Sequence, residues 1–279
     1  MPPPTADLSG WSGQPYAAAG LTYEVYKKGT GPGVVLMPEV PGIHPAVLAL
    51  GNYLVTKGFT VVIPSLFGTP GKPRGGGYAL RTIARLCVTR EFMAFATDGE
   101  RPIAKYIRAL ASDLNNCTPG RGVGVIGMCF TGGFALAAAV DGSVLASVLS
   151  QPAVPFPLIP AQRRDPGLSD NELDVVIERA RSGEVCALGL RFSADRKVPP
   201  ERFATLSERL GSAFEIIPLD SSPGNPYNFG RSAHSVLTDE VREQAGHPAF
   251  EARERVAAFL TERLIAPSDL DDNGGGSTR

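Results

Sequence analysis

Short apolar, strand-like runs alternate with helical patterns along most of the chain, and this alternation limits the possible folds more than any other feature. The predicted strands cover residues 21–28, 33–39, 59–66, 122–127, 143–150, 185–192 and 213–219. The predicted helices cover residues 45–58, 130–140, 171–183, 199–211 and 247–264, with further helical patterns after the Gly/Pro-rich loop 67–77 as far as about residue 116. Such alternation is typical of a mainly parallel sheet with helices on both faces. The sequence therefore predicts an α/β protein whose ligand site lies at the carboxyl ends of the strands.

The chain is long enough for one large domain with a substantial core. It has 279 residues, of which 43% are hydrophobic, and it contains no internal repeat. Residues 1–20 begin with a Pro- and Gly-rich stretch, and residues 266–279 are acidic and rich in Gly and Ser. We predict a flexible N-terminal segment and a disordered C-terminal tail over these ranges. A single domain is expected over residues 21–265, with residues 21–28 as its edge strand.

Charge and composition exclude several classes of function. The formal net charge is −1 and no dense Lys/Arg stretch occurs, which argues against nucleic-acid binding. No apolar run reaches the roughly 18–20 residues of a membrane span, and the first residues lack the basic start and apolar core of a signal peptide. The four cysteines form no close pairs, which disfavours a zinc site or a disulfide framework. We expect a cytoplasmic enzyme or small-molecule binder without a metal, nucleotide or flavin cofactor.

Cys129 lies where a predicted strand meets a predicted helix, within the stretch GMCFTGG at 127–133. A nucleophile on such a turn is raised above the sheet edge, and the backbone N–H that follows it points at an incoming carbonyl oxygen. The flanking glycines supply the small residues that the turn needs. The stretch lacks both the GxGxxG spacing and the lysine of a phosphate-binding loop. Cys129 is therefore the predicted nucleophile, and a structural role is expected for the other cysteines, Cys87, Cys117 and Cys186.

A nucleophilic thiol needs a base, and the chain contains only three histidines. His234 is the preferred base because it lies in a Gly/Asn/Ser-rich loop after the strand at 213–219. His247 directly precedes a proline at the start of the last helix, a position that suits a turn. His44 lies in the loop after an early strand, where it either lines the site or serves the turn.

The base in turn needs an orienting carboxylate. Asp195 follows the strand at 185–192 immediately, and Asp220, which follows the strand at 213–219, is the fallback. With Asp195 as the acid, the chain order is nucleophile, acid and then histidine, each after its own strand. That order is the one found in α/β-hydrolases.

Together these motifs resemble the dienelactone hydrolase family, a cysteine branch of the α/β-hydrolase fold, over about residues 20–265. The family carries G-x-C-x-G-G at the turn of its nucleophile, which corresponds to 127–133 in this chain. Its acid lies in a D-x-x-V-P segment, matched by 195–199, and its histidine loop is matched by 233–235. An early glutamate followed by a glycine turn is matched by 39–42.

The resemblance implies roles for particular residues. Cys129, His234 and Asp195 would form a catalytic triad, and Glu39 would hold the thiol and help to ionise it. The backbone N–H groups of two further residues would form the oxyanion hole, and these residues are Val40 and Phe130.

Substrate recognition follows less directly from the resemblance. Family enzymes bind a substrate carboxylate through arginines, and Arg81 and Arg90 are the candidate equivalents, with an ordinary surface role as the alternative. Thr131 departs from the family pattern because it replaces a glycine two residues after the nucleophile, where its side chain is expected to crowd the turn. Extra residues at 66–78 and 151–170 are expected to reshape or cover the pocket.

The predicted function is hydrolysis of carboxylic esters or lactones (EC 3.1.1 class) through a thioester on Cys129. The expected partner is a small-molecule ester or lactone, with no nucleic acid and no membrane. Two alternatives stay open. A Cys-dependent amidotransferase would pair His234 with a late glutamate such as Glu240, and a non-catalytic binder would use the same scaffold without turnover.

Overall fold

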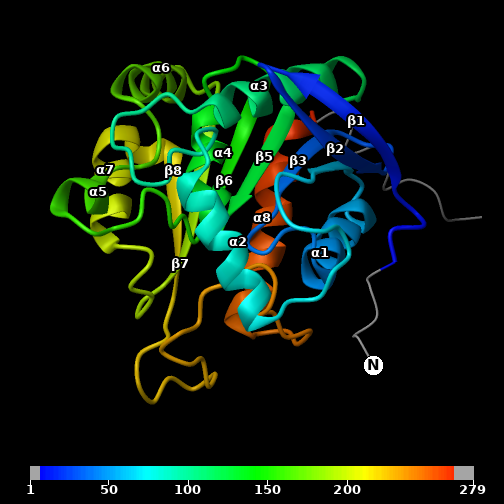
Figure 1. Ribbon diagram of the computed structural model, residues 1–279. Helices are drawn as coiled ribbons and strands as arrows, with labels where there is room; N and C mark the ends of the chain where they lie inside the picture. The colour runs from blue at the N-terminus through cyan, green and yellow to red at the C-terminus, as the bar shows by residue number, and fades with distance from the viewer. Residues whose placement is uncertain (1–6, 267–279) are drawn as a thin grey trace, which may run out of the picture.

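The structure, a computed structural model, describes residues 7–266 and confirms the α/β class (Figure 1). Its strands are β1 (Ser12–Ala18), β2 (Leu21–Lys28), β3 (Gly33–Met37), β4 (Thr60–Pro64), β5 (Val123–Met128), β6 (Val144–Ser150), β7 (Cys186–Phe192) and β8 (Phe214–Leu219). They form one sheet in the order β1-β2-β4-β3-β5-β6-β7-β8. β2 pairs antiparallel with both β1 and β4, and every other neighbouring pair is parallel. The sheet is therefore mainly parallel, as predicted.

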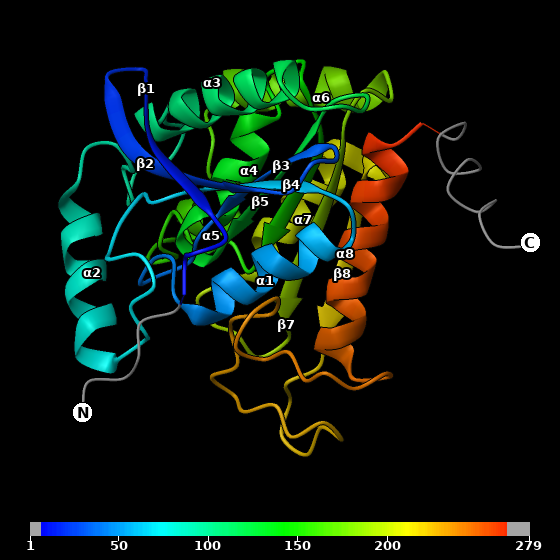
Figure 2. The ribbon, with the colours of Figure 1, turned by 90° about the vertical axis from the view of Figure 1, so that its right-hand side faces the viewer.

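Helices cover both faces of this sheet. They are α1 (Pro45–Thr56), α2 (Gly76–Val88), α3 (Pro102–Asn116), α4 (Gly132–Ala138), α5 (Pro160–Arg164), α6 (Asp170–Arg181), α7 (Pro200–Leu210) and α8 (Pro248–Leu264). Several begin with a proline, whose fixed φ and missing N–H suit the first helical position. Figure 2 shows α3 and α6 on the opposite side of the sheet from α1 and α8. The sheet is thus the middle of three layers.

The apolar core has one part on each side of the sheet. Val34 and Leu36 of β3 pack with residues of α1 and α8, whereas Val35 and Met37 pack with residues of α3, α4, α6 and α7. Successive side chains of a strand point to opposite faces, so a strand covered on both sides must be apolar throughout. This requirement explains why the central strands appear in the sequence as continuous apolar runs.

The prediction of a flexible segment at 1–20 is wrong for residues 12–18, which form strand β1. β1, and not β2, is consequently the edge strand of the sheet. Ala19 and Gly20 join the two strands with φ values of 51° and 76°, the left-handed backbone of a two-residue hairpin turn. The strand was missed because most of its side chains are exposed, so no apolar stripe marks it. Residues 1–6 and nearly all of the predicted tail, 267–279, lie outside the described residues.

The parallel strands bring the predicted site residues to one edge of the sheet. Glu39, Cys129 and Asp195 come shortly after β3, β5 and β7 respectively. His234 lies in the long loop between β8 and α8, which extends from the sheet at the bottom of the view in yellow to orange (Figure 1). None of the helices within residues 7–266 combines the length and apolar character that a membrane crossing requires.

Candidate active site

Cys129 lies on a tight turn between β5 and α4, which we call the nucleophile elbow (residues 127–133). Residues Cys129–Thr131 form a single 3₁₀ turn, and Cys129 has a φ of 54°, in the left-handed region that non-glycine residues rarely adopt. Gly127 allows this turn to close, because a Cβ at that position would lie 2.3 Å from the backbone oxygen of Thr131. Gly132 is equally necessary, since its Cβ would lie 2.5 Å from Cα of Pro152. Strained backbone of this kind is typical of functional positions.

His234 and Asp195 meet at the carboxyl edge of the sheet. Nδ1 of His234 lies 2.5 Å from Oδ2 of Asp195, so the aspartate accepts the hydrogen on this nitrogen and orients the ring. Oδ1 of Asp195 accepts the backbone N–H of Lys197 at 3.0 Å. Asp195 is 5% exposed, and its carboxylate is therefore held by the protein and not by solvent.

His234 is also electrostatically coupled to Cys129. Burial of the ring disfavours its charged form and is the largest single effect on its pKa. The charge of Cys129 and the hydrogen bond and charge of Asp195 act against burial, and together they raise the pKa of His234 to about 10. Nε2 of His234 is buried and has no hydrogen-bond partner among the described residues, so this nitrogen is available for proton transfer. The raised pKa keeps the ring of His234 protonated at neutral pH.

The other candidate acids and bases lie elsewhere. The carboxylate of Asp220 is exposed and accepts hydrogen bonds from Ser193 and Ser222. Burial raises the pKa of Glu240. Among the described residues, the carboxylate hydrogen-bonded to the ring of His234 is that of Asp195 and not that of Glu240. His247 caps α8 with its ring packed against Tyr227 and Phe229.

Glu39 lies fully buried in the turn after β3, at the centre of a polar cluster that the sequence did not reveal. One carboxylate oxygen lies 2.6 Å from Nη2 of Arg74, and the other accepts the hydroxyl of Ser235 at 2.8 Å. The remaining partners of the carboxylate are the side chains of His44, Gln151 and Thr238. Burial opposes ionisation, but the bond from His44, the charge of Arg74 and the bond from Thr238 lower the pKa of Glu39 to about 2. Among residues 7–266, none of its hydrogen bonds involves Cys129.

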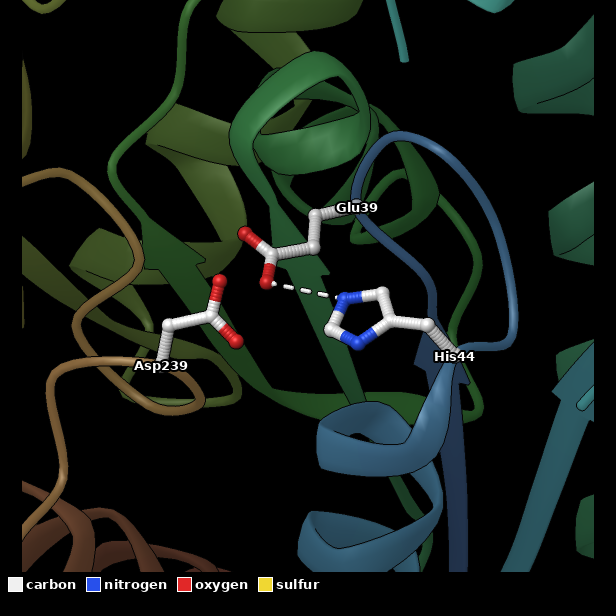
Figure 3. A group of neighbouring side chains, drawn as sticks. All are labelled: Glu39, His44 and Asp239. Atoms are coloured by element: carbon white, nitrogen blue, oxygen red, sulfur yellow. Dashed lines mark hydrogen bonds and ion pairs between the residues drawn. The ribbon is translucent and has the colours of Figure 1, made fainter. Parts of the chain in front are cut away.

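Three residues of this cluster carry side-chain atoms that can bind a metal ion, but the positive charge between them is the guanidinium of Arg74. Glu39 and His44 lie in the turn between β3 and α1, Asp239 lies in the loop between β8 and α8, and their ligand atoms lie within 4.8 Å of one another (Figure 3). The guanidinium of Arg74 lies 2.6 Å from both carboxylates and 3.3 Å from Nε2 of His44. The cluster is therefore a salt-bridge network around Arg74.

The cluster anchors the loop that carries the histidine. Ser235, which directly follows His234, and Thr238 both donate their hydroxyl hydrogens to Glu39. The backbone N–H of Val236 donates to the side chain of Gln151 at 3.3 Å. The sequence could have indicated the position of Gln151, because this polar residue directly follows an apolar strand and therefore lies at the carboxyl ends of the strands. The sequence could not have placed Arg74 beside Glu39, since its Gly/Pro-rich loop has no pattern that shows which part of the protein it contacts.

Replacing Glu39 with glutamine is expected to lower the free energy of unfolding by about 3 kcal/mol at pH 7. The ordinary pKa of 4.5 and the folded value of about 2 differ by roughly this free energy. Because the folded pKa is depressed, the contribution is complete above pH 4.5 and is lost as the pH falls through about 2. Urea unfolding measures the difference in unfolding free energy between wild type and Glu39→Gln at pH 7 and at pH 3.5. This difference should be smaller by about 1 kcal/mol at the lower pH.

Glu178→Gln is the matched control for this experiment. Glu178 forms an exposed ion pair with Arg181, and each of the two side chains is 71% exposed. Its loss should cost less than about 0.5 kcal/mol. An equal effect of the two substitutions, or a gap for Glu39→Gln that does not depend on pH, would show that Glu39 does not hold the cluster through its charge.

The predicted oxyanion-hole residues lie on adjacent strand ends. Val40 follows Glu39 in the turn after β3, Phe130 follows Cys129, and β3 pairs directly with β5. Both side chains are buried, which fixes the main chain around them. Their role stays a prediction that this geometry allows.

Thr131 does not crowd the nucleophile elbow, contrary to expectation. Its side chain is fully buried, and its hydroxyl forms a hydrogen bond with the backbone N–H of Met128 at 2.9 Å. The hydroxyl oxygen also lies 3.3 Å from the carbonyl oxygen of Met37 and 3.2 Å from that of Pro38, at the end of β3. A size argument from the sequence could not include these partners.

Cationic side chains line hollows near this edge of the sheet. Asp195 borders an open hollow of about 730 Å³, which is also lined by Arg196, Lys197 and Arg231. Arg81 lines a separate hollow of about 280 Å³. The second predicted carboxylate-binding arginine, Arg90, is exposed just after the end of α2. Substrate binding by either arginine stays a prediction.

Comparison with known proteins identifies the family. Residues 19–229 match the model of the dienelactone hydrolase family. This span includes Glu39, Cys129 and Asp195 and ends before His234. No curated protein matches the chain in sequence.

Solved structures share the fold at low sequence identity. A protein of Klebsiella pneumoniae subsp. pneumoniae MGH 78578 assigned as a dienelactone hydrolase is 16% identical, with 90% of this chain and 98% of that chain covered and a TM-score of 0.61. A dienelactone hydrolase-like promiscuous phosphotriesterase from metagenomic libraries is 15% identical, with 91% and 98% covered and a TM-score of 0.62. The dienelactone hydrolase of Anabaena variabilis ATCC 29413 is 14% identical, with 90% and 99% covered and a TM-score of 0.52. The eight-stranded sheet is that of an α/β-hydrolase, and with the family match over most of its length this chain belongs to the dienelactone hydrolase family of hydrolases.

Proposed function

We propose that this protein hydrolyses carboxylic esters or lactones through a thioester on Cys129. The observation that carries the proposal is the position of the His234 ring. Asp195 holds one of its nitrogens at 2.5 Å, and Cys129 and Asp195 together raise the pKa of His234 to about 10 against the effect of burial. A thiolate beside an oriented imidazolium is the arrangement that nucleophilic attack on a carbonyl requires.

The reaction begins with attack of the Cys129 sulfur on the carbonyl carbon. The carbonyl π electrons move to the oxygen, where the N–H groups of Val40 and Phe130 stabilise the negative charge. The intermediate collapses to a thioester as the C–O bond breaks, and the imidazolium of His234 gives its proton to the leaving alkoxide.

The second half of the reaction uses the same groups. His234, now neutral, removes a proton from water, and the resulting hydroxide attacks the thioester carbonyl. The carbon–sulfur bond breaks, the carboxylic acid leaves, and the thiolate of Cys129 and protonated His234 are restored. Asp195 keeps the ring in one orientation through both halves. The expected substrate is a small molecule, and a thiol nucleophile with three further free cysteines suits the reducing cytoplasm.

The direct test combines turnover with capture of the thioester. Wild-type protein is mixed with p-nitrophenyl acetate and with a small lactone at neutral pH. We expect p-nitrophenol release, and intact-mass analysis after an acid quench should show an added acetyl group, located at Cys129 by peptide mapping. Prior alkylation of the thiol should prevent both results.

Other outcomes would favour the alternative functions. Glutaminase activity without ester turnover would indicate an amidotransferase. A thiol that reacts with iodoacetamide at the rate of free cysteine, with no turnover on either substrate, would indicate a binding protein. Hydrolysis without an acylated intermediate, at a rate unchanged by alkylation, would contradict the proposed nucleophile.

A further inference from the structure

Thr131 forms an unusual set of contacts for a side chain at this position. It is fully buried, and its hydroxyl oxygen accepts the backbone N–H of Met128 at 2.9 Å. The same oxygen lies 3.0 Å from the carbonyl oxygen of Met128, 3.2 Å from that of Pro38 and 3.3 Å from that of Met37. A hydroxyl has a single hydrogen to donate, so these three carbonyl oxygens share it. The side chain thus joins the elbow to the end of β3.

The hydroxyl of Thr131 lies just beyond the point where the backbone pairing of β3 with β5 ends. The last paired residues of β3 and β5 are Met37 and Gly127. Beyond them β3 enters the turn that carries Val40, and β5 enters the elbow. Among the described residues, the bond from Thr131 spans these two segments just past the end of their ladder.

We propose that Thr131 is a positioning residue that fixes the spacing between the two N–H groups of the oxyanion hole. These groups belong to Val40, two residues after Pro38, and to Phe130, directly before Thr131. The inference rests on the proposed function, because it assumes that a tetrahedral oxyanion forms there. Oxyanion donors act at about 2.7–3.1 Å from the oxygen, and a misplacement of about 1 Å can cost on the order of 100-fold in rate.

The alternative of a passive, space-filling threonine fits the contacts less well. An apolar side chain of equal volume would fill the same space but would leave the buried N–H of Met128 without the partner that Thr131 provides. The family motif carries glycine at this position, which would also lack the bond. The hydroxyl, and not the volume, is therefore the part of Thr131 that connects β3 with the elbow.

The test compares Thr131→Val with Thr131→Ser in the full-length protein. Valine removes the hydroxyl at similar volume, and kcat for p-nitrophenyl acetate should fall about 10- to 100-fold with KM nearly unchanged, because the loss falls on the transition state. Thr131→Ser keeps the hydroxyl, and its kcat should lie within about threefold of the wild-type value. Iodoacetamide alkylation of Cys129 should keep its wild-type rate in both variants. That reaction attacks a saturated carbon and develops no oxyanion.

Each other outcome overturns the inference in a recognisable way. Wild-type kcat in Thr131→Val would show that the hydroxyl does not position the oxyanion hole. Parallel loss of kcat and of alkylation rate would show that Thr131 acts on the thiol–imidazole pair instead. Absence of turnover in the wild type would overturn the proposed function itself and this inference with it. If the valine variant does not fold, Thr131→Gly serves as the second hydroxyl-free variant, with the same expected loss.

Discussion

Replacing Cys129 with alanine is expected to abolish ester hydrolysis, with kcat/KM at least about 10⁴-fold below wild type. The substitution removes the atom that forms the thioester, and no other cysteine of the described chain lies on a strand-to-helix elbow. His234 should respond as well. Without the thiolate, the largest influence that raises its pKa is gone, so its titration should shift toward lower pH. Initial rates with p-nitrophenyl acetate and an NMR titration of the His234 ring measure the two effects.

Cys186→Ala is the matched control, because Cys129 and Cys186 are both half-buried free cysteines. Cys186 lies at the start of β7, the amino end of the strand whose other end leads to Asp195. Its replacement should leave the rate within about twofold of wild type. Equal turnover by wild type and Cys129→Ala, with the folded state intact by thermal unfolding, would exclude Cys129 as the nucleophile.

The sheet and the placement of Cys129 and Asp195 beyond the carboxyl ends of its strands could be predicted from the sequence for one physical reason. Parallel strands are buried on both faces, so they appear as uninterrupted apolar runs, and a polar residue directly after such a run must lie at the carboxyl edge. Asp195 follows its strand in this way, and Cys129 follows its strand directly. β1 was missed because it is an exposed edge strand without an apolar stripe.

The surroundings of Glu39 could not be predicted in the same way. Its partners come from the loop before α2, from the end of β6 and from the histidine loop, and only folding brings these segments together. The expectation that Glu39 holds the thiol came from the resemblance to the family, which does not include these partners. In the structure its carboxylate is engaged by Arg74, Ser235 and Thr238, so it anchors the loop that carries His234. Its help in ionising the thiol stays a prediction, whereas its contact with the histidine loop is a property of the fold.

Asp195→Asn is expected to lower kcat/KM by about 10²- to 10⁴-fold while the protein stays folded. Asparagine has the shape of aspartate, but its amide nitrogen can donate a hydrogen bond to Nδ1 of His234. That bond stabilises the tautomer with hydrogen on Nε2, the nitrogen that must accept the proton in catalysis. The substitution also removes a hydrogen bond and a negative charge that contribute to the raised pKa of His234. The thiolate–imidazolium pair should weaken, and iodoacetamide alkylation of Cys129 should slow together with hydrolysis.

Asp220→Asn provides the matched comparison, since Asp220 is the alternative acid and follows strand β8. Its carboxylate is exposed and accepts hydrogen bonds from Ser193, in the loop after β7, and from Ser222, in the loop after β8. It should therefore retain activity within about threefold of wild type. The reverse pattern, full activity in Asp195→Asn and loss in Asp220→Asn, would contradict the acid assignment. Loss in both variants with unequal alkylation rates would still identify the residue that orients the ring, because only that residue changes the reactivity of the thiol before any substrate binds.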